Sequence, residues 1–449
     1  MTFRTRRRGL VAATAIAAGA LALSACSSGS LGSSDSPSAT ASGGGAAVEI
    51  TFLVDNSDQT YKPAKALADA FNATKTGVTV NVETRPQGAD GDNIVKTKLA
   101  TGDMADVFQY NSGSLLQALD PAKNLVPLTD EPYMSSVLDG FKPAVTTDGQ
   151  VYGVPFGTAM GGGILYNKDV FSKLGLSVPK TWDEFQANNA KIKAAGIDPV
   201  IQSYGDTWTS QLFVLADYYN VNAANPDWAQ QYTANDPNAK YTKEPAIQGF
   251  QRLQEVHDKG YVNKDFASIK LDKALNYLVS GKGAQYPMLT FAVASYVGAD
   301  PSSASKIGFF AQPGDDAATN GLTAWTSSGL YVPTTTEGDK LDAVKKFLAF
   351  VATPAACEAQ SSAAAPTGPY YIKDCTLPAD LPAAVQDLQS YFTAGNNSPA
   401  LEFLSPVKGP NLEKITVEVG SGIRSAEDGA ALYDEDVKKQ AQQLGLPGW

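Results

Sequence analysis

The sequence predicts an α/β protein made of two lobes, and three observations lead to this prediction. Residues 48–84 are expected to form a strand, a helix and a second strand, which is the basic unit of a parallel α/β sheet. Further amphipathic helices are expected as far as the C-terminus. About 400 residues follow the N-terminal leader and a Gly/Ser-rich segment, which is too long for one small core and suits two lobes of roughly 150 to 250 residues each.

The first part of the chain provides the strands of this unit. "VEITFLVD" (48–55) has the composition of a buried strand, and "VTVNVET" (78–84) alternates valines with polar residues, as a strand with one buried face does. The segment 62–77 between them is predicted to be a helix with Pro63 in its first turn. The pattern then predicts a short helix and a third strand, at 93–102 and 105–110.

Three later helices have their own signals. Thr181 and Glu184 have the spacing of a capping box at the start of one helix, and Gly196 suits its end. Residues 340–353 place apolar side chains on one helical face, and residues 425–445 run from acidic to basic, which suits the helix dipole. These apolar stripes indicate core packing rather than a binding site.

The N-terminus has the order of a secretory signal, because four arginines precede an apolar run at 10–23 that is shorter than the roughly 20 residues needed to cross a bilayer. The residues LSAC (23–26) resemble the bacterial lipobox, in which the signal is cut before a cysteine that carries a diacylglycerol. We therefore predict a signal at 1–25, a lipidated Cys26 and a flexible tether at 26–47. An ordinary signal peptide next to a cysteine is the alternative, and export by the general or the twin-arginine route stays open.

The charge balance argues against nucleic acid as a partner. The chain has 35 basic and 46 acidic residues, a net charge of -11, and loss of the leader with its four arginines lowers the charge to -15. Nucleic-acid phosphates need clustered Lys and Arg. No second apolar segment approaches membrane-spanning length, so we expect a protein that is tethered to a membrane and not embedded in it.

Cys357 and Cys375 are the cysteines that remain after Cys26. A disulfide between them is favoured in an exported protein, and two separate buried thiols are the alternative. His257 is the only histidine, so the sequence contains no Cys/His metal cluster. We expect neither a metal nor a cofactor.

Several motifs carry a family resemblance in their order along the chain. The most specific are GVP at 153–155, YNKD at 166–169 and TWDEF at 181–185. From residue 48 to the C-terminus the chain resembles the extracellular solute-binding proteins of bacterial ABC importers, in the sugar-binding, maltose-binding-protein-like branch.

The resemblance implies a two-lobed fold of the periplasmic-binding-protein type (type II), with the ligand in a cleft between the lobes. Three segments would cross between the lobes, near residues 155–160, 322–329 and 361–366. The N-terminal lobe would comprise residues 48–157 and 327–362, and the C-terminal lobe residues 158–326 and 363–449.

A sugar presents hydroxyls and apolar C–H faces, so its site needs flat aromatic rings beside polar side chains. Ligands of open α/β sheets bind beyond the carboxyl ends of the strands. The polar candidates are Asp55, Asn56, Tyr110, Asn111, Thr158 and Glu402, and the aromatic candidates are Trp208, Trp325 and Phe291. The resemblance alone implies Phe291. Asp55 could instead cap its own loop, and either tryptophan could be a core residue.

Three consecutive glycines at 161–163 lack the strand-to-helix setting of a phosphate-binding loop. We interpret them as positions of close backbone packing beside the first crossing.

The sequence therefore predicts a monomeric receptor on the outer face of the cell membrane that captures a sugar or oligosaccharide and delivers it to an ABC permease. A non-sugar polar solute of the same kind of importer is the alternative. A secreted glycosidase is disfavoured because no pair of carboxylates stands out from the solvated helix faces. A serine hydrolase would depend on His257 alone.

Overall fold

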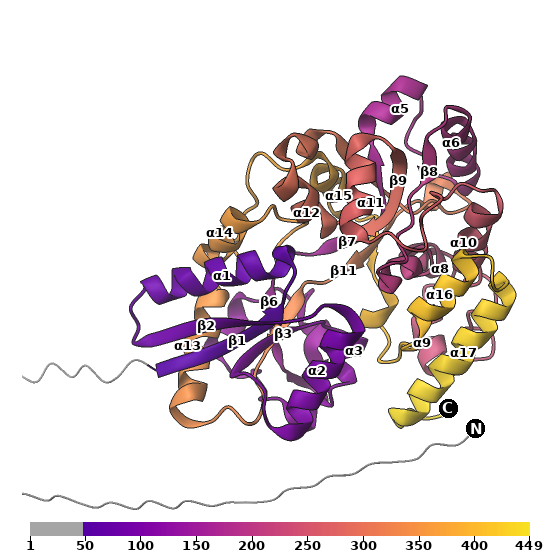
Figure 1. Cartoon of the computed structure of the whole chain (residues 1–449). Helices are drawn as coiled ribbons and strands as arrows, with labels where there is room; N and C mark the ends of the chain where they lie inside the picture. Colours follow the sequence, from indigo (N-terminus) through magenta and orange to yellow (C-terminus); the bar gives the residue numbers. More distant parts are fainter. Residues whose placement is uncertain (1–47) are drawn as a thin grey trace, which may run out of the picture. The chain divides into compact units, whose positions relative to one another are not determined.

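Two β-sheets organise residues 48–449, which are the residues that the computed structural model describes (Figure 1). Cys26, the predicted signal and the predicted tether lie outside these described residues. Helices surround each sheet, so the predicted α/β class is confirmed. Within residues 48–449, no helix combines the length and the apolar character that a membrane crossing requires.

The first sheet has the strand order β2-β1-β3-β12-β6. Its strands are β1 (Val48–Asp55), β2 (Val78–Arg85), β3 (Val107–Tyr110), β6 (Gly153–Phe156) and β12 (Ser328–Tyr331). Strand β1 is parallel to β2 and β3, and the register sets Asp55 opposite Arg85. Because β12 is antiparallel to both β3 and β6, the carboxyl ends of β1, β2, β3 and β6 meet at one edge of the sheet.

Apolar helices pack onto this sheet and form the first core. Phe347 of α13 lies between Phe52 of β1 and Phe71 of α1, with ring centroids 5.5 Å and 5.3 Å away. The helices of this lobe are α1 (Asp58–Ala73), α2 (Gly88–Thr101), α3 (Ser114–Gln117), α4 (Pro121–Asn124), α13 (Gly338–Val351) and α14 (Pro354–Ala363), and β4 (Thr146–Thr147) and β5 (Gln150–Val151) form a small hairpin.

The second sheet is built around β7, which pairs with β9 on one side and with β10 and β11 on the other. Its strands are β7 (Met160–Asn167), β8 (Asp198–Val200), β9 (Gly283–Leu289), β10 (Ile307–Ala311), β11 (Leu322–Trp325) and β13 (Asn397–Pro399). Seven of the eight residues of β7 are buried, so this strand is the centre of the second core.

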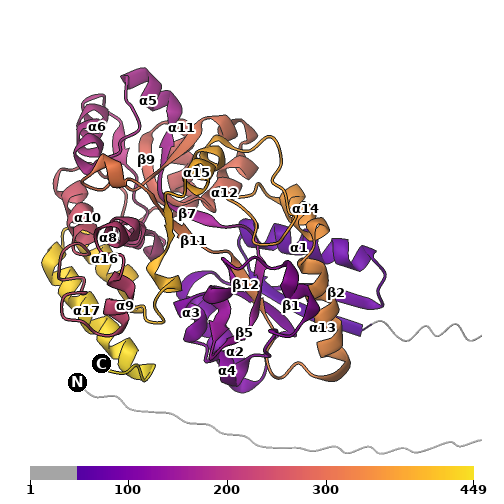
Figure 2. The ribbon, with the colours of Figure 1, turned by 180° about the vertical axis from the view of Figure 1, so that it is seen from behind.

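The remaining helices cover the second sheet, and Figures 1 and 2 both place α16 and α17 beside α10. They are α5 (Lys168–Leu174), α6 (Trp182–Ala194), α7 (Leu212–Ala216), α8 (Tyr218–Ala224), α9 (Trp228–Thr233), α10 (Gln248–Asp258), α11 (Leu271–Ser280), α12 (Ala292–Ala299), α15 (Ala383–Ala394), α16 (Leu412–Gly420) and α17 (Ala426–Gln443). The capping box of Thr181 and Glu184 is present at the start of α6, as predicted.

The three glycines of β7 permit close packing. A Cβ atom at Gly161 would lie 2.3 Å from Leu388, at Gly162 2.2 Å from the ring of Trp325, and at Gly163 2.4 Å from the carbonyl oxygen of Phe310. Real Cβ atoms essentially never come this close to a neighbour, so a side chain at any of these positions would force neighbouring atoms to shift. The interpretation of close backbone packing is confirmed.

The chain passes between the two sheets three times. The first passage lies between β6 and β7 (157–159), the second between β11 and β12 (326–327), and the third between α14 and α15 (364–382). The predicted end of the N-terminal lobe at 362 is too early, because Tyr370, Ile372 and Cys375 pack with the core of the first sheet. A disulfide joins Cys375 to Cys357 of α14 and keeps this part of the third passage on the first lobe.

The predicted start of the first helix is wrong. Helix α1 begins at Asp58, so Pro63 lies inside it rather than in its first turn. The added residues are polar and give no apolar periodicity, although Asp58 suits the positive end of the helix dipole and forms an ion pair with Lys62. Helix α2 likewise begins earlier than predicted, at Gly88.

Candidate functional site

A cavity of about 490 Å³ opens at the carboxyl edge of the first sheet and is lined by residues of both lobes and of the first and third crossings. This volume is within the range of small-molecule sites in proteins. The crossings form the hinge-side wall, and each lobe contributes a wall of different chemistry.

The wall from the first lobe is polar and charged. Asp55, Arg85 and Asn111 reach the cavity from the ends of β1, β2 and β3, and Asp92 reaches it from α2. Arg85 is buried, donates to the carbonyl oxygens of Pro86 at 3.1 Å and Gln109 at 3.4 Å, and has no carboxylate within ion-pair distance among the described residues. Burial raises the pKa of the Asp92 carboxyl, and the neighbouring charge of Arg85 only partly offsets this effect.

The wall from the second lobe is aromatic. Trp208 lies in a short 3₁₀ helix, η3 (Thr207–Gln211), and Phe291 directly precedes α12. Their ring centroids are 5.7 Å apart with an interplanar angle of 45°, and both rings line the cavity. Trp208 is only partly buried, so it offers ring surface to a ligand.

Trp325, at the end of β11, adds a third ring to the cavity wall. Packing and a hydrogen bond both fix the position of this ring. Its ring lies over Gly162, and its indole N–H donates to Glu402 at 2.5 Å. The other carboxylate oxygen of Glu402 accepts from Lys408 at 3.2 Å. Trp325 is 6% exposed, so it belongs to the core as well as to the cavity wall.

The hinge-side wall combines the first and third crossings. The hydroxyls of Thr158 and Thr367 are hydrogen-bonded at 2.8 Å, and the side-chain oxygen of Gln360 accepts from the backbone N–H of Gly157 at 3.0 Å. All four residues line the cavity. The wall is therefore made from segments about 200 residues apart in sequence.

Seven of the nine candidate residues line the cavity, namely Asp55, Asn111, Thr158, Trp208, Phe291, Trp325 and Glu402. Asp55 also accepts hydrogen bonds from the backbone N–H and the hydroxyl of Ser57, so it caps its loop and faces the cavity.

Asn56 and Tyr110 do not line the cavity, and these two predictions are corrected here. Asn56 is exposed beside the strand edge, where its backbone N–H donates to Arg85. Tyr110 is fully buried in the first core, and the guanidinium group of Arg85 lies over its ring, with 5.7 Å between the guanidinium carbon and the ring centroid.

Sequence reasoning missed several residues of the cavity wall. Arg85 follows from the same rule that selected Asp55, since β2 is parallel to β1 and ends at the same edge. Gln360 lies near the end of α14, and Thr367 and Tyr370 belong to the third crossing that follows it; the position of that crossing was the available signal. Among residues 48–449, no cluster of three His, Cys, Asp or Glu side chains has a geometry suited to a metal ion.

Two α/β lobes that are joined by three crossings and enclose a cavity define the two-lobed, periplasmic-binding-protein-like class of fold. The chain belongs to the family of bacterial extracellular solute-binding proteins, whose family model matches residues 55–357.

Known proteins similar to this chain agree with that assignment. The "Multiple sugar-binding protein" of Streptococcus mutans is 28% identical over 275 residues, which cover 60% of this chain and 63% of the relative. The chain thus spans less than two thirds of that relative's length. Among solved structures, a "Chitin oligosaccharide binding protein" aligns with a TM-score of 0.76 at 22% identity, covering 89% of this chain and 100% of its own. "SBP RafE in complex with raffinose" aligns with a TM-score of 0.72 at 21% identity, covering 88% of this chain and 99% of its own. These two structures show that the fold is shared.

Proposed function

We propose that the cavity binds a carbohydrate, either a sugar or an oligosaccharide. The observation that carries the proposal is the division of the cavity wall, with the rings of Trp208 and Phe291 on the second lobe and Asp55, Arg85 and Asn111 on the first. Aromatic rings suit the apolar faces of a sugar, and charged or amide groups suit its hydroxyls. The names of the relative from Streptococcus mutans and of both structural neighbours refer to sugars or oligosaccharides, which supports this ligand class.

The role that follows is capture of the carbohydrate outside the cell and its delivery to an ABC permease. Closure of two lobes around a ligand is a known mode of hinge motion, and three crossings provide the hinge here. We propose a monomeric receptor without catalytic activity. Its anchor would be the lipid on Cys26, with the tether leading to the first strand at Val48.

A thermal-shift screen tests the ligand class. The panel contains mono- and oligosaccharides, including raffinose and chitobiose, with spermidine and inorganic phosphate as non-sugar solutes. A ligand at 100 times its dissociation constant stabilises the folded state by about 2.7 kcal/mol, so a true ligand raises the melting temperature clearly. We expect a carbohydrate to do so. If spermidine or phosphate raises the melting temperature and no carbohydrate does, the ligand is a non-sugar solute and the carbohydrate proposal is wrong.

Replacement of Glu402 by glutamine is expected to weaken binding of the carbohydrate found in that screen by about 1 kcal/mol, roughly fivefold. The carboxylate holds the indole N–H of Trp325 and the ammonium group of Lys408, and a neutral amide holds both less firmly. Calorimetric titration measures the change. In a Trp325→Phe background, which lacks the indole N–H, Glu402→Gln should reduce the carbohydrate affinity by a smaller factor. An equal loss of affinity in both backgrounds would contradict the role assigned to Glu402.

The lipid anchor predicts that Cys26→Ser abolishes stable membrane association, because this position carries the acyl chains in the proposed lipoprotein. Fractionation of cells that express the wild type and the variant measures this. The anchor is disproved when the variant remains with the membrane fraction to the same extent as the wild type.

A further inference from the structure

The disulfide between Cys357 and Cys375 closes a segment that contains much of the hinge-side wall of the cavity. The two cysteines are 18 positions apart. Six residues between them line the cavity: Gln360, Ala364, Ala365, Pro366, Thr367 and Tyr370. We define this stretch, residues 360–370, as the hinge-wall segment.

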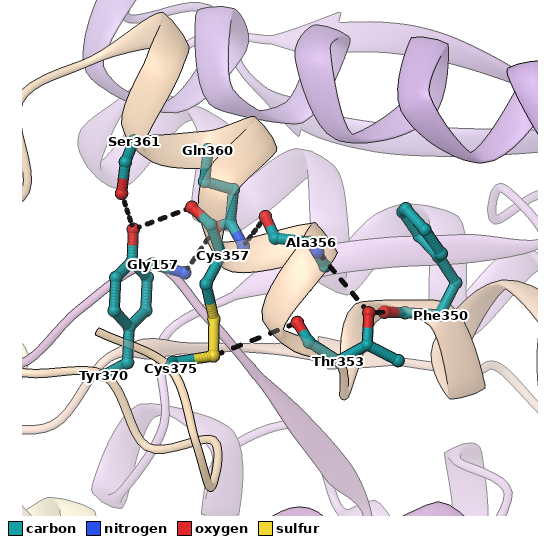
Figure 3. Close-up of a disulfide and its surroundings, with 9 residues drawn as sticks. All are labelled: Gly157, Phe350, Thr353, Ala356, Cys357, Gln360, Ser361, Tyr370 and Cys375. Carbon is teal, nitrogen blue, oxygen red and sulfur yellow. Dashed lines mark hydrogen bonds between the residues drawn. A yellow bond between two sulfur atoms is a disulfide. The ribbon is translucent and has the colours of Figure 1, made fainter. Parts of the chain in front are cut away.

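Hydrogen bonds tie the end of the hinge-wall segment to the helix that carries Cys357. The hydroxyl of Tyr370 donates to the carbonyl oxygen of Cys357 at 3.1 Å and is 2.5 Å from the hydroxyl of Ser361 (Figure 3). Figure 3 also shows Cys375 next to Thr353, at the start of α14. Tyr370 is buried. Its hydrogen bonds and the disulfide at Cys375 both attach residues 370–375 to α14.

The hinge-wall segment is attached to the first crossing through the backbone. The N–H of Gly157 donates to Gln360, and the N–H of Ala159 donates to the carbonyl oxygen of Pro369 at 2.7 Å. A Cβ atom at Gly368 would lie 2.4 Å from the carbonyl oxygen of Ala159. The two crossings are therefore in direct backbone contact, and a shift of one requires a shift of the other.

The segment also reaches the second lobe. The hydroxyl of Thr290 donates to the carbonyl oxygen of Thr367 at 2.9 Å and accepts from the N–H of Gly161 at 3.0 Å. Thr290 directly precedes Phe291, whose ring packs against Trp208. Contacts thus run from the disulfide through the hinge-wall segment to the aromatic wall.

We propose that the Cys357–Cys375 disulfide is a positioning device for the binding cavity, which holds the hinge-wall segment against the first crossing in the geometry that receives the ligand. Without the bridge, the segment would be held by the packing of Tyr370 against the first core and by hydrogen bonds, each of which contributes little net free energy because water competes for it. A loosened wall must be ordered again when ligand binds, which lowers affinity. The consequence for affinity rests on the proposed carbohydrate function, and the positioning of the wall does not.

Hydrogen exchange on the unliganded protein tests the positioning directly. In the Cys357→Ala/Cys375→Ala variant, held well below its melting temperature, we expect the amides of Gly157 and Ala159 to exchange at least tenfold faster than in the wild type. Amides in the centres of β1 and β7 should keep their rates. Unchanged rates at Gly157 and Ala159 would overturn the proposal, and so would an equal acceleration in both sheets, because that result assigns the bridge to overall stability alone.

Two neighbouring serines on α14 provide a matched pair that keeps the disulfide. Ser361 contacts Tyr370, whereas Ser362 is exposed and donates only to Ala359 of its own helix. Ser361→Ala should accelerate exchange at Ala159 about threefold, and Ser362→Ala should not. Equal behaviour of the two variants would count against the role of Tyr370 in holding the wall.

Calorimetric titration with raffinose and chitobiose then separates the two proposals. If either sugar binds the wild type, the double cysteine variant should bind it at least threefold more weakly, and unchanged affinity overturns the positioning role. If neither binds, the carbohydrate proposal is weakened and the exchange rates at Gly157 and Ala159 decide this inference.

Discussion

Trp208→Ala is expected to weaken carbohydrate binding at least tenfold, or about 1.4 kcal/mol, while the melting temperature of the unliganded protein changes little. Trp208 is partly exposed in η3, lines the cavity and packs on Phe291 from one side. A ligand ring that covers the free surface of an indole buries apolar area and gains an aromatic contact, and both gains are lost with the side chain. Calorimetric titration gives the affinity, and melting curves of the unliganded variant give the stability.

Trp182 is the matched control. Its ring is buried in the second core against Phe185, and its indole N–H donates to Glu255 at 2.6 Å. Trp182 does not line the cavity. Trp182→Ala should therefore cost about 3 to 5 kcal/mol of stability, as large-to-small changes in cores do. If Trp208→Ala also lowers stability by such an amount and leaves the carbohydrate affinity unaltered, Trp208 is a core residue and does not bind the ligand.

Asp217→Ala is expected to destabilise the protein by about 3 to 5 kcal/mol, because it removes one partner of a buried ion pair. The side chains of Asp217 and Arg252 are only 2% and 4% exposed and are in direct contact. Asn220 at 2.8 Å and Gln312 at 3.1 Å also donate to the same carboxylate oxygen. The substitution leaves these donors and the buried charge of Arg252 without this acceptor. Thermal or denaturant unfolding measures the loss.

Asp315 offers a comparison on the same arginine. It accepts from Arg252 at 2.9 Å, but its side chain is 67% exposed, so Asp315→Ala should cost less than about 1 kcal/mol. Neither residue lines the cavity, and carbohydrate affinity should survive both changes at temperatures where the variants are folded. Similar stability losses for the two aspartates would show that burial does not govern this network.

The sequence predicted the elements that have strong local signals. The alternating valines of β2, the apolar run of β1 and the capping box of α6 depend on neighbouring residues only, and each element formed where expected. The start of α1 was missed because residues 58–62 are polar and their helical conformation has no apolar stripe. Trp228 has polar neighbours in the sequence, which give no sign of burial, yet it is buried and its ring stacks on Tyr232 with centroids 4.8 Å apart.

The candidate site was predictable as far as strand ends could be located. Asp55 and Asn111 follow from the position of the carboxyl edge, but the direction of a single side chain depends on its neighbours across the sheet. Tyr110 of β3 shows this, since Arg85 from β2, two strands away in the sheet, lies over its ring. The contacts between Thr158 and Thr367 join positions 209 apart, and no local pattern encodes such a pairing.

A crystal structure of the protein with the carbohydrate that gives the largest thermal shift tests the central claim most directly. We expect a sugar ring in the cavity with one apolar face on Trp208, about 4 Å from the indole plane, and with its hydroxyls in contact with residues of the first lobe such as Arg85 and Asn111. A carbohydrate bound outside this cavity, or bound within it without contact to Trp208, would contradict the account.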